Sequence, residues 1–206
     1  MPRRGVRDPA SKERIVETAR RCIAVSGLGG ATVRAIAAEA GVSTGYVMHY
    51  FPDKRQLEAA VLVANNAIAG ARVARASRRG RGLAALTTAV EAVLPLDADR
   101  RLEWQVWIAF WTAADADEQR GDGLVGARRA LKRILAVPFA EAIADGELPE
   151  ALDVDYECER LMTLAAGLGL TAGASSAAEL RRLARRMLDD HLASLATTPA
   201  RRTRAS

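Results

Sequence analysis

Residues 32–51, "TVRAIAAEAGVSTGYVMHYF", decide the fold of this chain. Thr32 and Ser43 each precede a short helical pattern and are good N-cap residues, because their hydroxyl oxygens accept hydrogen bonds from first-turn N–H groups. Between the two patterns, Gly41 suits the left-handed stop of a helix. Two short helices joined by a turn of roughly three to four residues with glycine form a helix-turn-helix. The segment therefore predicts a helix-turn-helix from Thr32 to Phe51.

The side chains of this segment divide between two faces. Apolar or small residues fall where a compact three-helix core needs them, at Ile36, Ala37, Val42, Val47 and Phe51. The remaining face carries hydroxyl, small and aromatic groups, and the N-terminal N–H groups of the second helix attract phosphate. We expect Thr44 and Tyr46 to reach base edges of DNA, and the phosphate contacts to come from Thr32, His49, Tyr50 and Lys54.

The charge of the chain is unevenly distributed. Residues 1–82 contain 15 Lys and Arg against 6 Asp and Glu, whereas residues 83–206 contain 15 against 19. A basic first part fits contact with a polyanion, and an acidic remainder fits a different task. Arg3, Arg4 and Arg7 could form an arm that enters a minor groove.

Helical periodicity runs through the whole chain and strand signals are almost absent, so the predicted fold class is all-α. We expect a helix-turn-helix DNA-binding domain over 1–53, a helical ligand-binding and dimerisation domain over 54–195, and a disordered tail over 196–206. The first helix is expected to begin at Asp8-Pro9 and to end before "SGLGG". Later helices are expected near 83–94, 101–114, 118–144, 153–172 and 176–195, with a joint at "SRRGRG" over 77–82 and a kink at Pro138.

The segment "ATVRAIAAEAGVSTGYVMHYFPDKRQLEAAV" resembles the N-terminal signature of the TetR family of one-component repressors. The resemblance implies a cytoplasmic homodimer that binds operator DNA through its N-terminal helices and a small-molecule effector through the rest. Many members carry tyrosine where this chain has Met48, which puts a phosphate contact there in doubt. "GYVMHYF", "EWQVWIAFW" and "DGELPEALDVDYECERLMTLAAGLGL" resemble the BetI-like, choline-sensing branch. Carried over by position, the DNA-binding set is Thr32, Arg34, Ser43, Thr44, Gly45, Tyr46, His49, Tyr50 and Lys54.

Three tryptophans, Trp104, Trp107 and Trp111, are spaced to share one helical face. Aromatic faces beside carboxylates such as Glu103, Asp115 and Asp117 can hold an organic cation. We therefore hypothesise a polyamine or quaternary ammonium effector at the tryptophans and Glu103. The alternative is that the aromatic stripe is only core. Asn65 and Asn66 are expected to face solvent, with polar lining of a pocket as the alternative.

The last predicted helix carries a leucine-rich stripe that could form a dimer interface with the preceding helix. The stripe comprises Leu180, Leu183, Met187, Leu188, Leu192 and Leu195. His191 lies near it and is expected to be an interface or surface residue. Pattern alone allows a second interpretation, in which both stripes are buried inside the monomer. The family resemblance favours the homodimer.

The sequence contains no recognisable arrangement of catalytic or metal-binding residues, so we expect no catalytic residue, no metal and no cofactor. No run of 18 apolar residues and no signal-like start occur, which favours the cytoplasm and argues against a membrane span. Cys22 and Cys158 do not form a disulfide framework and are expected to be reduced. The competing function is a helical small-molecule carrier or interaction protein with a non-functional helix-turn-helix.

Overall fold

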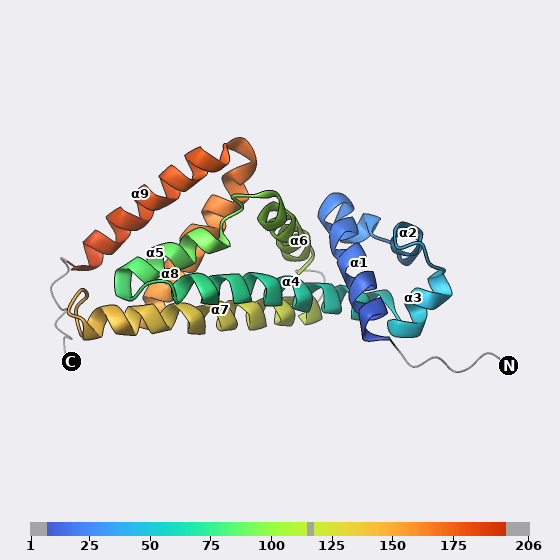
Figure 1. Ribbon diagram of the computed structural model, residues 1–206, viewed down its shortest axis with the longest axis horizontal. Coiled ribbons are helices and arrows are strands. Elements are labelled where there is room, and N and C mark those ends of the chain that lie inside the picture. Colours follow the sequence, from blue (N-terminus) through green and yellow to red (C-terminus); the bar gives the residue numbers. More distant parts are fainter. Residues whose placement is uncertain (1–7, 115–117, 197–206) are drawn as a thin grey trace. The chain divides into compact units, whose positions relative to one another are not determined.

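The computed structural model describes residues 8–114 and 118–196 (Figure 1). Within these ranges the chain is helical and contains no strand, which confirms the predicted fold class. Arg3, Arg4, Arg7, Asp115, Asp117 and the tail from residue 197 lie outside the described residues. The helices are α1 (Pro9–Gly30), α2 (Val33–Glu39), α3 (Thr44–Tyr50), α4 (Lys54–Ser77), α5 (Gly82–Val93), α6 (Ala98–Ala114), α7 (Glu118–Ala144), α8 (Val154–Thr171) and α9 (Ala177–Ala196), with a 3-10 turn, η1 (Ala172–Ala174), before α9.

Local chemistry places most helix starts where the sequence predicted them. The Asp8 carboxylate accepts hydrogen bonds from the N–H groups of Ala10 and Ser11, both at 3.1 Å, and Pro9 occupies the first turn. Asp53 accepts from Gln56 N at 2.8 Å before α4. Asp153 accepts from Tyr156 N at 3.0 Å before α8. Each carboxylate satisfies an N–H group that has no partner inside its helix.

The end of α1 differs from the prediction. The helix was expected to stop before residue 26, but it extends to Gly30 with an interruption at Gly27. Gly27 has φ +67°, a conformation that glycine adopts without the Cβ penalty. The chain therefore breaks its helical path at one residue and resumes it, so a glycine-rich stretch that suggests a loop adds a last turn instead.

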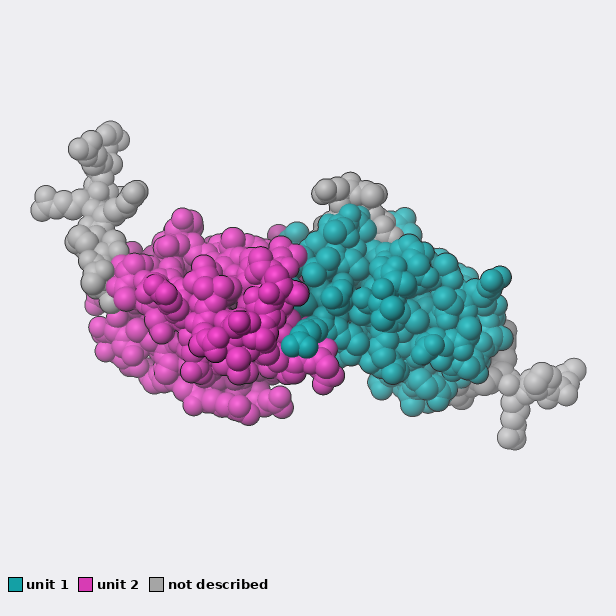
Figure 2. All heavy atoms as spheres, turned by 90° about the horizontal axis from the view of Figure 1, so that it is seen from above, with its two compact units in different colours: residues 1–68, 101–126 teal, residues 69–100, 127–206 magenta. Residues whose placement is uncertain are grey.

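The chain divides into two compact units (Figure 2). The first takes Met1–Ile68 and Arg101–Gly126, and the second takes Ala69–Arg100 and Ala127–Ser206. The division runs through α4, α6 and α7 rather than between helices. The first unit thus contains the helix-turn-helix together with the beginning of α4 and most of α6.

One hydrophobic core holds the first unit together. It joins Ile15 of α1, Val47 of α3 and Leu57 of α4 to Val106 and Phe110 of α6. All five side chains are at most 1% exposed. Each fully buried side chain of this size contributes about 1.5–3 kcal/mol, so α6 is an integral part of the unit that carries α3.

The second unit is built around α5, α8 and α9, which contact one another. Leu86, Leu161 and Leu188 are among its fully buried side chains. Burial raises the pKa of Cys158 to about 11, which keeps its thiol protonated at neutral pH. Cys22 and Cys158 are both free in the part of the chain that the structure describes.

Among the described residues, α4 is the one helix long and apolar enough by length and composition to cross a membrane. The buried side chains of its first half, including Leu57, Val61 and Leu62, belong to the core of the first unit. A core helix of a folded domain meets the same criterion of length and composition.

Candidate nucleic-acid interface

The turn between α2 and α3 is fixed by side-chain caps and one glycine. Thr32 Oγ1 accepts from Ala35 N at 3.1 Å, and Ser43 Oγ accepts from Tyr46 N at 3.1 Å. Gly41 has φ +66° and ends α2, after which Val42 N donates to Ala37 O at 2.9 Å. Figure 1 shows α2 and α3 beside α1, with α3 following α2 through this turn. The capping and stop roles predicted for Thr32, Ser43 and Gly41 are confirmed.

One face of α3 is open to solvent. Thr44, Gly45 and His49 are exposed, as is Ser43 at the cap. Val47 lies on the opposite side and is fully buried. Met48 is 41% exposed, so the open face also contains an apolar side chain. The start of α3 is thus available to a partner, and its free N–H groups and positive helix end favour a negatively charged one.

Gly45 is not required by the packing of the chain. A Cβ atom added there would meet only Ser43 Oγ, at 3.9 Å, which is ordinary van der Waals contact. The residue also does not have a positive φ. A glycine on an exposed helix costs stability relative to alanine, and neither packing nor a positive φ explains the glycine here.

Three aromatic side chains of α3 pack edge to face. The Tyr46 and Tyr50 rings lie 5.4 Å apart between centroids, and the His49 and Tyr50 rings lie 5.3 Å apart. Tyr46 is half-buried, whereas Tyr50 is buried and its hydroxyl accepts from Asp8 N at 3.2 Å. The side-chain hydrogen bond with Tyr46 raises the pKa of Tyr50. Tyr50 thus ties the beginning of α1 to α3 from the inside, while Tyr46 and His49 lie nearer the surface.

The predicted phosphate ligands differ in how open they are. Lys54 is partly exposed, but its Nζ donates to Leu28 O at 2.5 Å and lies 3.5 Å from Glu58 Oε1. Thr32 and Arg34 are exposed at the start of α2. Of the two members of the predicted set that carry a permanent positive charge, Arg34 is therefore open to solvent, whereas Lys54 is held by groups of the chain.

Two exposed basic residues near this surface were not in the predicted set. Lys12 of α1 lies with its Nζ 5.5 Å from the centre of the Phe51 ring, and Arg55 is exposed in the first turn of α4. The sequence signal for a DNA contact at Arg55 was its place beside Lys54. The signal at Lys12 was its position in the first turns of a helix that follows a basic arm. Both could have been identified from the three-helix pattern.

The tryptophans of α6 form a cluster in the first unit. Trp104 is buried and contacts Trp107 and Trp111 edge to face, with ring centroids 5.4 and 5.7 Å apart. Trp107 is half-buried and donates through Nε1 to Asn66 Oδ1 at 2.8 Å. Trp111 is 37% exposed. The common face predicted from their spacing is present, with Trp104 buried and with Trp107 and Trp111 reaching solvent in part.

A buried polar network lies beside this cluster. Asn65 is fully buried, its amide donates to the Glu103 carbonyl oxygen at 3.2 Å, and Arg20 Nη1 donates to Asn65 Oδ1 at 3.5 Å. The Glu103 side chain is buried as well. The expectation that Asn65 faces solvent is wrong, because the amide satisfies polar groups that α1 and α6 bring into the interior.

Comparisons with known proteins agree with this geometry. Residues 15–61 match the family described as "Bacterial regulatory proteins, tetR family", and residues 82–197 match "BetI-type transcriptional repressor, C-terminal". The chain is 28% identical to the HTH-type transcriptional regulator BetI of Burkholderia thailandensis, over 73% of this chain and 78% of that protein. It is 27% identical to the HTH-type transcriptional regulator PksA of Bacillus subtilis, over 93% of each chain.

A solved structure is similar over most of the fold. It is a transcriptional regulator from Saccharomonospora viridis in complex with choline, which is 25% identical and superposes with a TM-score of 0.80. The similarity covers 88% of this chain and 97% of that one. The family matches extend over the helix-turn-helix and most of the later helices. The chain therefore belongs to the TetR family of transcriptional regulators, with a C-terminal region of the BetI type.

Proposed function

We propose that this protein is a cytoplasmic homodimeric repressor that binds double-stranded, palindrome-like operator DNA and is released by a small-molecule effector. The observation that carries the proposal is the exposed face of α3, on which Thr44, Gly45 and His49 are open to solvent. Two copies would place their α3 helices in major grooves about one helical turn, ~34 Å, apart. Tyr46 and Thr44 would contact base edges, and Thr32, Arg34 and His49 would contact phosphates.

Exposed apolar side chains on α8 and α9 support the homodimer. Leu183 and Met187 are separated by one turn of α9 and are 48% and 40% exposed, and Leu170 near the end of α8 is 57% exposed. The remaining leucines of the α9 stripe are buried inside the chain, so they stabilise the monomer. Leu183 and Met187 would supply the self-complementary contact about a two-fold axis.

For the effector we retain the cationic amine suggested by the tryptophans. The S. viridis regulator binds choline, and the partly exposed Trp111 and Trp107 rings offer aromatic faces to a quaternary ammonium group. Trp104 and Glu103 would shape the site from within. Calorimetric titration with choline, spermidine and an uncharged lipophile tests this assignment. Heat of binding with choline or spermidine and none with the lipophile supports the assignment. No heat of binding with either amine refutes it.

Release from DNA would follow from a shift of α4, which begins directly after the helix-turn-helix and runs through both units. A ligand changes the equilibrium only by its differential affinity for the two arrangements. A preference of ~100-fold for the released arrangement supplies about 2.7 kcal/mol.

A mobility-shift assay on the DNA upstream of the chain's own gene tests the proposal against the carrier alternative. A repressor retards this DNA selectively, and its affinity falls steeply as salt rises, because phosphate contacts release counterions. A carrier with a non-functional helix-turn-helix retards upstream and unrelated DNA equally weakly. Addition of the effector should restore the free DNA band.

A further inference from the structure

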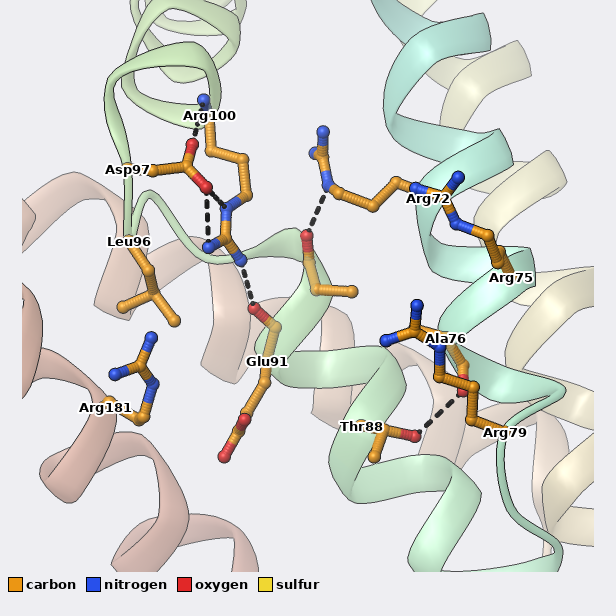
Figure 3. Close-up of a pocket in the computed structure, with 11 residues that line it drawn as sticks. Arg72, Arg75, Ala76, Arg79, Thr88, Glu91, Leu96, Asp97, Arg100 and Arg181 are labelled. Atoms are coloured by element: carbon orange, nitrogen blue, oxygen red, sulfur yellow. Dashed lines mark hydrogen bonds and ion pairs between the residues drawn. The ribbon is translucent and has the colours of Figure 1, made fainter.

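The second unit contains a cavity of about 360 Å³, and five of its eleven lining residues are arginines (Figure 3). The basic side chains come from three parts of the chain: from α4 and the turn that follows it, from the first turn of α6, and from α9. Cavities that bind small molecules have volumes of roughly 300–1,000 Å³. The five arginines that line it are Arg72, Arg75, Arg79, Arg100 and Arg181.

Two of these arginines have a structural role. Arg72 Nε donates to Ala92 O at 2.8 Å, and Arg100 Nη1 donates to Glu91 O at 3.0 Å. Both carbonyls lie in the last turn of α5, where a helix leaves C=O groups without intrahelical partners and where positive charge is favourable. Arg72 and Arg100 therefore cap α5, which explains their presence without a ligand.

The remaining three arginines have no such role. Arg75, Arg79 and Arg181 are exposed, and no hydrogen bond or ion pair of their side chains occurs with any residue that the structure describes. Arg75 lies in the last turn of α4, Arg79 in the turn that follows α4, and Arg181 in α9, so different parts of the chain bring their charges to the same cavity. Packing does not account for this convergence.

The acidic groups of the cavity are already paired. Asp97 accepts from Arg100 Nε at 2.8 Å, and Glu91 forms an ion pair with Arg185, which lies outside the lining. Burial acts to raise the pKa of Asp97, but hydrogen bonds from Arg100 and the charges of Arg100 and Arg72 hold that pKa below its ordinary value. Five arginines against two carboxylates leave the lining with a net positive charge.

We infer that this cavity binds a small oxyanion carrying two or more negative charges, held by Arg75, Arg79 and Arg181. The guanidinium group presents its donors as a planar fork that matches both carboxylate and phosphate oxygens, and such pairs are among the strongest hydrogen bonds in proteins. The inference goes beyond the proposed function, because this site is distinct from both the DNA-reading face and the tryptophan cluster. It does not require the chain to bind DNA.

The test is calorimetric titration of the full chain with sodium phosphate and, separately, with sodium citrate, at an ionic strength held constant by sodium chloride. We expect saturable binding of at least one anion with one site per chain. Saturation by phosphate alone assigns a phosphoryl ligand, and saturation by citrate alone assigns a polycarboxylate. The absence of saturable binding for both anions overturns the inference.

Matched charge variants locate the site. The double variant R79Q/R181Q should weaken binding at least ~10-fold, since it removes two charge-assisted contacts. The control R78Q/R182Q removes the same charge from the neighbouring exposed positions, which do not line the cavity, and should change the affinity less than ~2-fold. Equal weakening by both pairs would show a diffuse charge effect and would overturn the site. The single variant R75Q repeats the test should R79Q/R181Q lose its helical circular dichroism. No DNA is present, so the outcome is independent of operator binding.

Discussion

Replacement of Gly45 by alanine should separate the stability of the protein from its function. The new Cβ would lie 3.9 Å from Ser43 Oγ and meet no other atom of the chain within 4 Å. Alanine in an exposed helix is about 0.5–1 kcal/mol more stable than glycine, and a position in the first turn of α3 favours the lower end of that range. For a chain of this size, this corresponds to a rise in the thermal midpoint of roughly 1–4 °C.

The same methyl group should weaken DNA binding. If the start of α3 approaches the groove as closely as the missing side chain indicates, an added carbon costs about 1–3 kcal/mol at each contact, which is a loss of roughly 5- to 150-fold in affinity per contact. Fluorescence anisotropy with the operator and thermal unfolding by circular dichroism measure the two effects. Gly126→Ala is the control, because Gly126 lies in α7 with open space around it and should gain stability without losing affinity. A Gly45→Ala protein that is stabilised and binds DNA within twofold of the parent would refute the close-approach argument.

Three further predictions follow from buried or exposed groups. Asn65→Ala should lower the free energy of unfolding by about 1–3 kcal/mol in chemical denaturation, because it leaves polar groups of α1 and α6 without their partner; a change below 0.5 kcal/mol contradicts the network. Leu183→Asp combined with Met187→Asp should convert the proposed dimer to monomer in sedimentation analysis with the helical content retained, and an unchanged sedimentation coefficient would exclude this face as the interface. Burial lowers the pKa of His191 from its ordinary value of 6.5, so the unfolded state takes up the proton first and the free energy of unfolding falls as the pH drops below 6.5. His191→Gln should flatten this dependence of the free energy of unfolding on pH. An identical dependence in the variant would assign it to other groups.

Much of the fold could be predicted from short-range chemistry. The caps at Asp8, Thr32, Ser43 and Asp153 each depend on one side chain and the N–H groups two or three residues later, so the sequence contains all the information needed. The stop at Gly41 has the same local character. Helix boundaries set in this way are found close to where they were expected.

Burial across the fold was harder to predict. From the sequence, Asn65 and Asn66 are expected to be ordinary polar residues of a helix surface. Asn65 is nevertheless fully buried, and Asn66 accepts a hydrogen bond from Trp107. Their environment depends on α1 and α6, which contact them from distant parts of the sequence. Tyr50 is similar, since its hydroxyl is held by the backbone of Asp8 inside the first unit. Periodicity identifies a helix face but not the polar groups that a distant helix brings to it.

The arginine-lined cavity was not visible in the sequence for the same reason. In the sequence, the pattern indicates a basic helix end before a joint at Arg72, Arg75 and Arg79. It indicates a solvated face of the last helix at Arg181. Only the packing of α5 and α9 brings these charges together. Spacing along one helix predicts which side chains share a face, whereas convergence of several helices requires the tertiary structure.

The most direct test of the central claim, that the exposed face of α3 reads DNA, is binding-site selection from a random duplex library with the parent protein and Tyr46→Ala in parallel. We predict that the parent enriches a two-fold-symmetric sequence and that Tyr46→Ala, still folded, binds with relaxed preference at the base pairs nearest α3. Enrichment of the same sequence with the same base preferences by both proteins, or no enrichment by the parent, would contradict the account.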